Sequence, residues 1–253
     1  MKFIGIIPAR YNSSRFPGKP LHIIEGKSMI RRVYEQCSQS SVLSVLAVAT
    51  DDVRIFDHVK SFGGNVVMTS PAHTCGTERC YETFQLLLAE NNLSVNDVVI
   101  NIQGDEPLID PKQIELVCSL FKSDEVQIAT LIRKIDTEAD LTSNTVMKVV
   151  TDKNNKALYF SRNVIPFLAD TDESKRLSAH TYYMHVGIYA YRAAILNEIV
   201  KLPQSALEKA ESLEQLRWLE NGYPIHVELT DIVSHSVDTP QDVEKIINLL
   251  NKK

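Results

Sequence analysis

Positive charges gather in the segment that follows the first apolar run of the chain. Phe3 to Pro8 is typical of a short buried strand, and Arg10, Arg15 and Lys19 follow within ten positions. A triphosphate carries about four negative charges, and such a segment can surround it with side-chain cations and backbone N–H groups. The segment also exceeds the usual length of a strand-to-helix loop, which favours a functional role. It contains neither G-x-G-x-x-G nor G-x-x-x-x-G-K-[ST], so neither dinucleotide-fold nor P-loop chemistry is indicated.

Two other polar segments carry residue types that suit a nucleotide site. Gln103 to Pro107 follows the apolar run Val98–Ile102, and a carboxylate at a strand end suits a hard cation that also binds phosphate. His73 to Arg79 leads into a helical pattern, where free N–H groups could meet an anion or a base edge. The residues alone also allow plainer interpretations: a solvated charged loop, an acidic turn and an ordinary helix start.

The elements that would position these segments alternate through the first half of the chain. Strands are predicted at 3–8, 45–49, 65–68 and 98–102, with helices near 28–37, 53–62, 80–88 and 110–121. Such alternation implies right-handed crossovers and a mainly parallel sheet. Ligands of such sheets bind at the carboxyl ends of the strands, where all three polar segments are expected.

The second half is less regular. Strands are predicted at 127–134, 146–152, 185–191 and 225–229, helices at 207–221 and 239–250, and an exposed loop at 170–178. No internal repeat, low-complexity tract or linker interrupts the pattern. We expect one domain, 1–253, with an inserted sub-region.

Composition limits the functional classes. The 253 residues are 44% hydrophobic and 23% charged, which is typical of a globular protein. A net charge of −5 argues against a general nucleic-acid binder. None of the four cysteines forms a Cys-x-x-Cys pair, and no apolar run approaches the roughly 18–20 residues that span a membrane. We therefore expect a reduced, cytoplasmic protein without a membrane or nucleic-acid partner.

Seven motifs, taken together, are specific. P-A-R-x-x-S-S-R-F-P-G-K-P, G-T-E-R, N-I-Q-G-D-E-P, A-L-Y-F-S-R, H-V-G-I-Y, L-E-Q-L-R and V-D-T-P occur in this order from Ile6 to about Asp242. The chain thereby resembles the 3-deoxy-manno-octulosonate cytidylyltransferase family. The resemblance implies an α/β fold like that of the nucleotide-diphospho-sugar transferases, in which a mainly parallel sheet is flanked by helices. It also implies that the inserted sub-region is used for dimerisation.

The resemblance further implies transfer of CMP from CTP to an acidic sugar, 3-deoxy-manno-octulosonate, for lipopolysaccharide synthesis. Mg²⁺ is the implied cofactor, and a homodimer is the implied assembly. Residues 1–125 would form the nucleotide-binding half, and residues 126–253 the sugar-binding and dimerisation half.

The family's site residues carry over to matching positions. Those implied for the nucleotide are Pro8, Ala9, Arg10, Ser14, Arg15, Lys19, Cys75, Gly76, Thr77, Arg79 and Gln103. Those implied for the sugar are Arg162, His185, Tyr189, Glu214 and Gln215. The implied metal ligands are Asp105 and Asp238, and the implied catalytic residues are Arg10, Lys19 and Asp105.

One position departs from the family pattern. The residue before Gly-Thr-Glu-Arg is usually Ser and is Cys75 here, and a thiol is a poorer hydrogen-bond donor than a hydroxyl. Two other functions stay open at this point: a cytidylyltransferase for another acid sugar, such as a sialic acid, and a non-catalytic nucleotide-binding module. The sequence does not fix the sugar variant, the number of metal ions or a general base.

Overall fold

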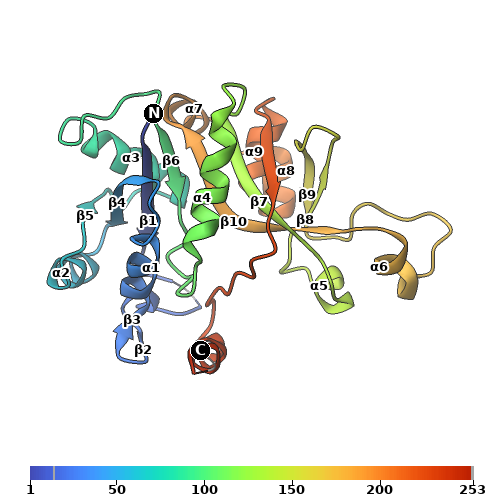
Figure 1. Cartoon of the computed structure of the whole chain (residues 1–253), viewed down its shortest axis with the longest axis horizontal. Helices are drawn as coiled ribbons and strands as arrows, with labels where there is room; N and C mark the ends of the chain where they lie inside the picture. The colour runs from blue at the N-terminus through green and yellow to red at the C-terminus, as the bar shows by residue number, and fades with distance from the viewer. Residues whose placement is uncertain (14, 252–253) are drawn as a thin grey trace.

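A nine-stranded sheet forms the centre of the computed structural model, which describes residues 1–13 and 15–251 (Figure 1). Ser14, for which a nucleotide contact is predicted, lies outside the described residues. Seven strands follow one another across the sheet in the order β5-β4-β1-β6-β10-β7-β11. Their bounds are Phe3–Ala9 (β1), Leu43–Thr50 (β4), Val66–Met68 (β5), Val98–Asn101 (β6), Ile128–Lys134 (β7), Tyr183–Arg192 (β10) and Ile225–Leu229 (β11).

Most of these strands are parallel, as the sequence predicts. β1 pairs in parallel with β4 and β6, β4 with β5, and β7 with β11. β10 is the exception, because it runs antiparallel to both β6 and β7. The carboxyl ends of β1, β4 and β6 therefore meet at one edge, which is the edge expected to bind ligands.

Helices cover both faces of the sheet, because successive strand side chains point to opposite sides. In β1, Ile4 and Ile6 belong to one apolar cluster, and Ile7 and Ala9 to the other. The second cluster includes residues of α1 (Met29–Cys37), α2 (Val53–Ser61) and α4 (Pro111–Ser119). The first includes residues of α3 (Gly76–Leu87), α7 (Ala193–Ile199) and α9 (Gln215–Glu220).

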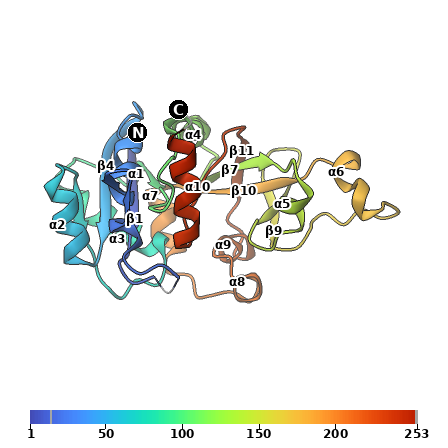
Figure 2. The same cartoon turned by 90° about the horizontal axis from the view of Figure 1, so that it is seen from below.

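An extension, here called the arm, projects from one side of the sheet (Figures 1 and 2). It comprises residues 135–182 and contains α5 (Glu138–Thr142), the hairpin β8 (Lys148–Thr151) and β9 (Ala157–Ser161), the short turn η3 (Glu173–Lys175) and α6 (Arg176–Ala179). β9 was not predicted, and the loop expected at 170–178 includes two short helical turns. The arm has its own small apolar core, formed around Ile135, Leu141 and Tyr182.

The prediction of one helix at 207–221 is wrong. The segment forms two helices, α8 (Ala206–Glu211) and α9, with Ser212 between them in the left-handed region at φ 53°. A buried ion pair fixes this bend: Arg217 Nε donates to Glu208 Oε2 at 2.8 Å, and both side chains are at most 8% exposed. The bend places Glu214 and Gln215 at the start of α9 rather than in mid-helix.

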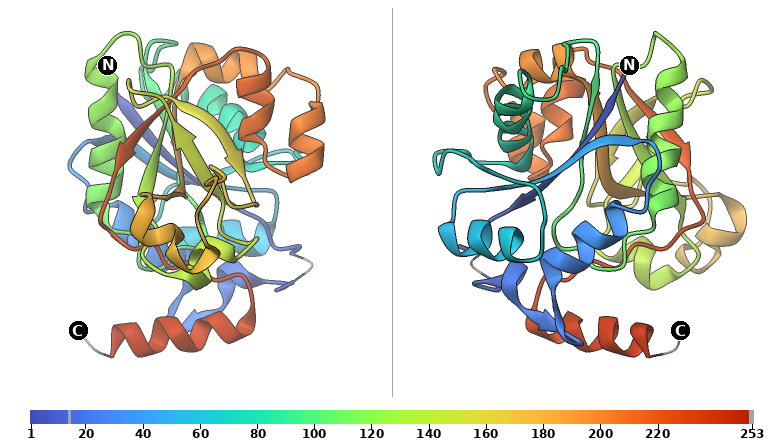
Figure 3. Two further views of the ribbon diagram at one scale, coloured as in Figure 1. Left: turned by 90° about the vertical axis from the view of Figure 1, so that its right-hand side faces the viewer. Right: turned by 60° about the vertical axis from the view of Figure 1, so that its left-hand side comes forward.

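The last part of the chain returns to the N-terminal half. After β11 it crosses the carboxyl edge of the sheet and ends in α10 (Pro240–Leu250), which lies beside the hairpin of β2 (Ile23–Ile24) and β3 (Lys27–Ser28) (Figure 3). Val243 and Ile246 pack with Phe16, Ile24 and Met29. Two short 3₁₀ helices, Lys19–Leu21 (η1) and Leu120–Lys122 (η2), complete the described elements. Within these residues, no helix is long and apolar enough to cross a membrane.

The pair between Glu208 and Arg217 gives a stability prediction. Glu208→Ala leaves a buried guanidinium without its carboxylate, which should lower the free energy of unfolding by roughly 3–5 kcal/mol in urea titrations. Lys209→Ala, at the next and exposed position, should change it by less than about 0.5 kcal/mol. Equal stabilities of the two variants would contradict the role of this pair.

Candidate active site

Three adjoining cavities open at the carboxyl edge of the sheet, and Gln103 lines all of them. The loop cavity, about 480 Å³, is lined by Pro8, Ala9, Arg10, Asn12, Ser13, Arg15, Lys19, Pro20, Gln103, Gly104 and Asp105. The aromatic cavity, about 210 Å³, is lined by Pro8, Gly76, Thr77, Asn101, Gln103, Tyr189, Tyr191, Glu214, Gln215 and Trp218. The arm cavity, about 370 Å³, is lined by Gln103, Asp105, Glu106, Arg133, Thr145, Val146, Met147, Met184, His185, Val186, Gly187, Ser234, Ser236 and Asp238.

The ammonium group of Lys19 bonds to Asp105, which lines both the loop and the arm cavities. Its Nζ donates to Asp105 Oδ2 at 2.6 Å and to the carbonyl oxygen of Val237 at 2.8 Å, and lies 3.8 Å from Asp238 Oδ1. Arg15 Nη2 donates to the same Asp238 oxygen at 3.0 Å. Two carboxylates that are far apart in sequence thus converge on two cations.

Two glycines allow the backbone to make this approach. A Cβ on Gly104 would lie 2.6 Å from the carbonyl oxygen of Pro8, so only glycine lets the Gln103–Asp105 turn pass so close to the end of β1. Gly18 has φ 71° and turns the cationic loop back, with its N–H donating to the Tyr11 carbonyl at 2.8 Å. The Tyr11 ring in turn carries the Arg54 guanidinium 3.3 Å from its centroid.

Asp105 and Asp238 suit a magnesium ion in number and chemistry. Mg²⁺ usually takes one or two protein carboxylates, and phosphate oxygens and water complete its shell. No cluster of three or more His, Cys, Asp or Glu residues that could hold a metal occurs in 1–13 or 15–251, so the described residues offer no dedicated all-protein cage. Lys19 and Arg15 lie beside this pair and offset its negative charge.

The aromatic cavity mixes residues predicted for the nucleotide with residues predicted for the sugar. The Glu214 carboxylate accepts hydrogen bonds from Thr77 Oγ1 at 2.8 Å and from the Cys75 thiol at 3.1 Å. Burial raises the pKa of Glu214, and burial together with this carboxylate raises the pKa of Cys75 to about 12. The thiol therefore stays protonated and donates to Glu214, so Cys75 keeps a hydrogen bond at the position where the family usually has Ser.

Two buried side chains that line the arm cavity have shifted pKa values. Burial lowers the pKa of His185 to about 4, and its Nε2 lies 3.0 Å from Thr130 Oγ1. Burial, followed by the charge of Asp105, raises the pKa of Glu106 to about 7. At neutral pH His185 is thus an uncharged ring that can donate or accept a hydrogen bond according to its tautomer.

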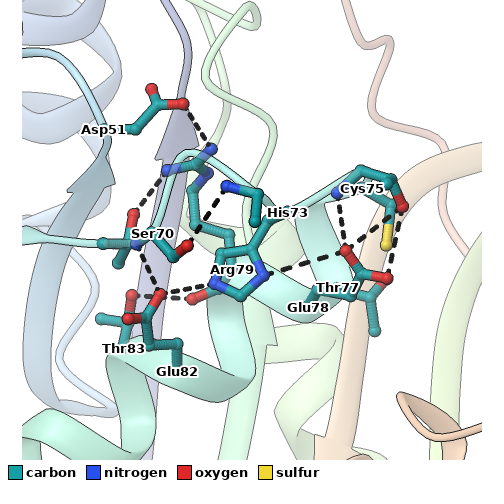
Figure 4. A network of polar contacts seen from close by, with 12 residues as sticks. Asp51, Ser70, His73, Cys75, Thr77, Glu78, Arg79, Glu82 and Thr83 are labelled. Carbon is teal, nitrogen blue, oxygen red and sulfur yellow. Dashed lines mark hydrogen bonds and ion pairs between the residues drawn. The ribbon is translucent and has the colours of Figure 1, made fainter.

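Arg79 does not line any of the three cavities. Its fully buried guanidinium donates to Thr69 Oγ1 and to Asp51 Oδ2, the latter at 3.0 Å (Figure 4). In the same network His73 lies between Glu82 and Glu78. Arg79 therefore ties the ends of β4 and β5 to α3 and supports the segment that leads to Cys75, instead of facing a ligand directly.

Arg162 also lines none of the three cavities and bonds to backbone carbonyls instead. Its guanidinium donates to the carbonyl oxygens of Glu211 at 2.7 Å, Asn144 at 3.0 Å and Ser212 at 3.4 Å. The contacts with Glu211 and Ser212 fasten the arm to the bend between α8 and α9. Arg162 and Glu214 form no ion pair with each other, because Glu214 bonds to Cys75 and Thr77.

Sequence reasoning missed several lining residues. No recognised motif contains Arg133, Tyr191 or Trp218. No role was predicted for Glu106, although it follows Asp105 directly. Strand alternation was the available signal for Tyr191, since it follows Tyr189 by two positions on β10 and faces the same side.

The neutral state of His185 predicts a pH dependence of stability. Between about pH 6.5 and 4 the unfolded chain takes up a proton on this imidazole while the folded chain does not, so stability falls as the pH falls. His185→Gln removes this titration, so its Tm should decline less than that of the parent from about pH 7 to about pH 4.5. Calorimetry across this range tests it, and parallel Tm profiles would refute it.

Comparison with known proteins identifies the family of this chain. A family model described as cytidylyltransferase matches residues 4–232. A 3-deoxy-manno-octulosonate cytidylyltransferase of Parabacteroides distasonis is 54% identical over 99% of this chain and 98% of its own length. An 8-amino-3,8-dideoxy-manno-octulosonate cytidylyltransferase of Shewanella frigidimarina is 47% identical over 97% of each chain.

The fold has a solved counterpart with nucleotide bound. The structure of CMP:2-keto-3-deoxy-manno-octonic acid synthetase complexed with CTP matches with a TM-score of 0.89 and 38% identity, over 100% of this chain and 99% of that one. A Leptospira borgpetersenii cytidylyltransferase shares only the fold, at 16% identity and a TM-score of 0.64. With a family model over nearly its whole length and relatives near half identity, this chain belongs to the cytidylyltransferase family.

Proposed function

We propose that this chain transfers CMP from CTP to 3-deoxy-manno-octulosonate, forming CMP-3-deoxy-manno-octulosonate and pyrophosphate for lipopolysaccharide synthesis. The observation that carries the proposal is that a cation-lined cavity and the cavity that contains the uncharged His185 ring share Gln103 and Asp105. The first suits a triphosphate and the second a polyhydroxylated sugar. The reacting groups would meet at their junction, beside Asp105.

The loop cavity would hold the phosphates of CTP. Arg10 offers a planar fork and Lys19 a point charge, and Arg15 lies at the rim with its side chain 66% exposed. The N-terminus of α3 at Gly76 and Thr77 and the amide of Gln103 border the adjoining aromatic cavity, where part of the nucleotide would lie. Pro8 lines both of these cavities, and Ala9 lines the loop cavity.

Asp105 and Asp238 would hold Mg²⁺. When bound, the ion offsets negative charge on the phosphates and on the departing pyrophosphate. Lys19, already within 4 Å of both carboxylates, would shift toward the phosphates or remain as a second cation beside them. The residues of this chain thereby reduce the repulsion between two anionic substrates.

The sugar would lie in the arm cavity, with His185 and Gln103 as hydrogen-bonding partners. Tyr189, Glu214 and Gln215 border the neighbouring aromatic cavity and would contact the sugar where the two cavities meet at Gln103. A sugar contact by Arg162 would require its guanidinium to leave the carbonyls that hold it. The anomeric hydroxyl would attack the α-phosphorus in line with the leaving pyrophosphate, and no covalent enzyme intermediate is needed.

Pyrophosphate release tests the reaction and the roles of Lys19 and Asp105. With CTP, Mg²⁺ and the octulosonate, Lys19→Ala should lower kcat/KM about ten- to a hundredfold, because it removes one charged hydrogen bond to the phosphates. Asp105→Asn should lose most turnover while its circular dichroism stays that of the parent. Replacing the sugar by a sialic acid is the substrate control: faster turnover with it would reject the octulosonate as substrate.

We also propose that the chain acts as a homodimer in the cytoplasm, where CTP is available, and that the arm forms the contact. Phe167 and Leu158 in the arm are 80% and 61% exposed, and Phe167 is the most exposed large apolar side chain among the described residues. Phe167→Glu should shift the protein toward the monomer in analytical ultracentrifugation. Val53→Glu, at a 59% exposed site on α2 away from the arm, is the matched control. A monomeric parent, or a dimer that persists in Phe167→Glu, would reject this surface.

A further inference from the structure

The arm cavity has charge of opposite sign at its two ends. Asp105, Glu106 and Asp238 lie at the end that meets the loop cavity. Arg133 is the single cationic side chain among the described residues that line this cavity. Its side chain is 17% exposed, so the charge is largely withdrawn from solvent.

Strand register places Arg133 far from the carboxylates. Gly187 marks the carboxylate end, because its carbonyl accepts a 2.8 Å hydrogen bond from Gln103, two residues before Asp105. Arg133 is paired across the sheet with Met184. Met184 is three residues from Gly187 along β10, which corresponds to about 10 Å at roughly 3.4 Å per residue.

The partners of Arg133 leave its charge available. Its Nη1 lies 3.4 Å from Asp136 Oδ2, but that carboxylate is 60% exposed, and such exposed pairs are weak. Its Nη2 donates to the Met184 sulfur at 3.2 Å, a weak and neutral acceptor. In contrast, the guanidinium of Arg162 is held by three carbonyl oxygens.

The chemistry of the proposed substrate fixes its direction in the cavity. In an eight-carbon ulosonate the carboxylate is attached to the anomeric carbon, which also carries the attacking hydroxyl. Both groups must therefore lie at the Asp105 end, where the phosphates meet the sugar. The opposite end of the molecule, with its terminal substituent, then extends along β10 toward Arg133.

We propose that Arg133 is a specificity-determining residue that makes this enzyme favour a sugar with a neutral terminal hydroxyl over one with a terminal ammonium group. This inference rests on the proposed function and adds the sugar variant to it. A primary amine has a pKa of about 10, so the 8-amino sugar named for the Shewanella relative carries a terminal positive charge at neutral pH. Placing that charge beside a partly buried guanidinium is unfavourable, whereas a hydroxyl accepts a hydrogen bond from it.

The test is the ratio of kcat/KM for the 8-hydroxy sugar to kcat/KM for the 8-amino sugar, measured by pyrophosphate release. The parent should favour the 8-hydroxy sugar at least about tenfold, as expected for one repulsive charge contact. Arg133→Gln should bring the ratio close to one, and Arg133→Glu should invert it. Arg133→Lys keeps the charge and should keep the preference.

Lys134→Gln is the matched control, since it removes one positive charge from the next position of β7, which is exposed. Its ratio should equal that of the parent. The proposal is overturned if the ratio is unchanged in Arg133→Gln and Arg133→Glu, or if both sugars lose efficiency equally, which would make Arg133 a general anion anchor. Turnover of neither sugar by the parent would instead reject the proposed function itself.

Discussion

The ammonium group of Lys19 is the contact on which the arrangement of the site depends. It bonds to Asp105 after β6 and to the Val237 carbonyl beyond β11, and the Val237 N–H bonds back to the Asp105 carbonyl at 2.9 Å. Three distant segments are thus fixed at one point. Without a cation there, the carboxylates of Asp105 and Asp238 would repel each other and separate. The same need for positive charge is why we propose a magnesium ion at this point.

The sheet positions these segments, and the irregular parts of the fold shape what surrounds them. The antiparallel strand β10 spans the sheet from the arm to β6, so its side chains border both the aromatic and the arm cavities. The bend at Ser212, held by Glu208 and Arg217, turns Glu214 toward Cys75 and Thr77 at the start of α3. The contacts of Arg162 with Glu211 and Ser212 then fasten the arm to this bend.

Much of this could be predicted from the sequence, for identifiable reasons. The runs Phe3–Pro8 and Val98–Ile102 are short and mostly apolar, which is typical of buried strands, and the polar loops that follow them lie at the predicted edge. The bend at Ser212 was missed because the helical periodicity continues across it. Roles for Arg79 and Arg162 followed from motifs, but sequence cannot tell whether a guanidinium is free or already bonded to Asp51 or to backbone carbonyls. Arg133 had no motif, and only strand register shows where it lies.

The return of the chain end to the first half of the fold also has a consequence for biosynthesis. Translation proceeds from the N-terminus, and domains begin to fold while the chain is still growing. β1, β4, β5 and β6 can pair, with Lys19 and Asp105 in place, long before Val237, Asp238 and α10 have left the ribosome. Pairing of these four strands can therefore precede completion of the ion-paired cluster. A chain that stops before Val237 lacks the residues that complete the cluster.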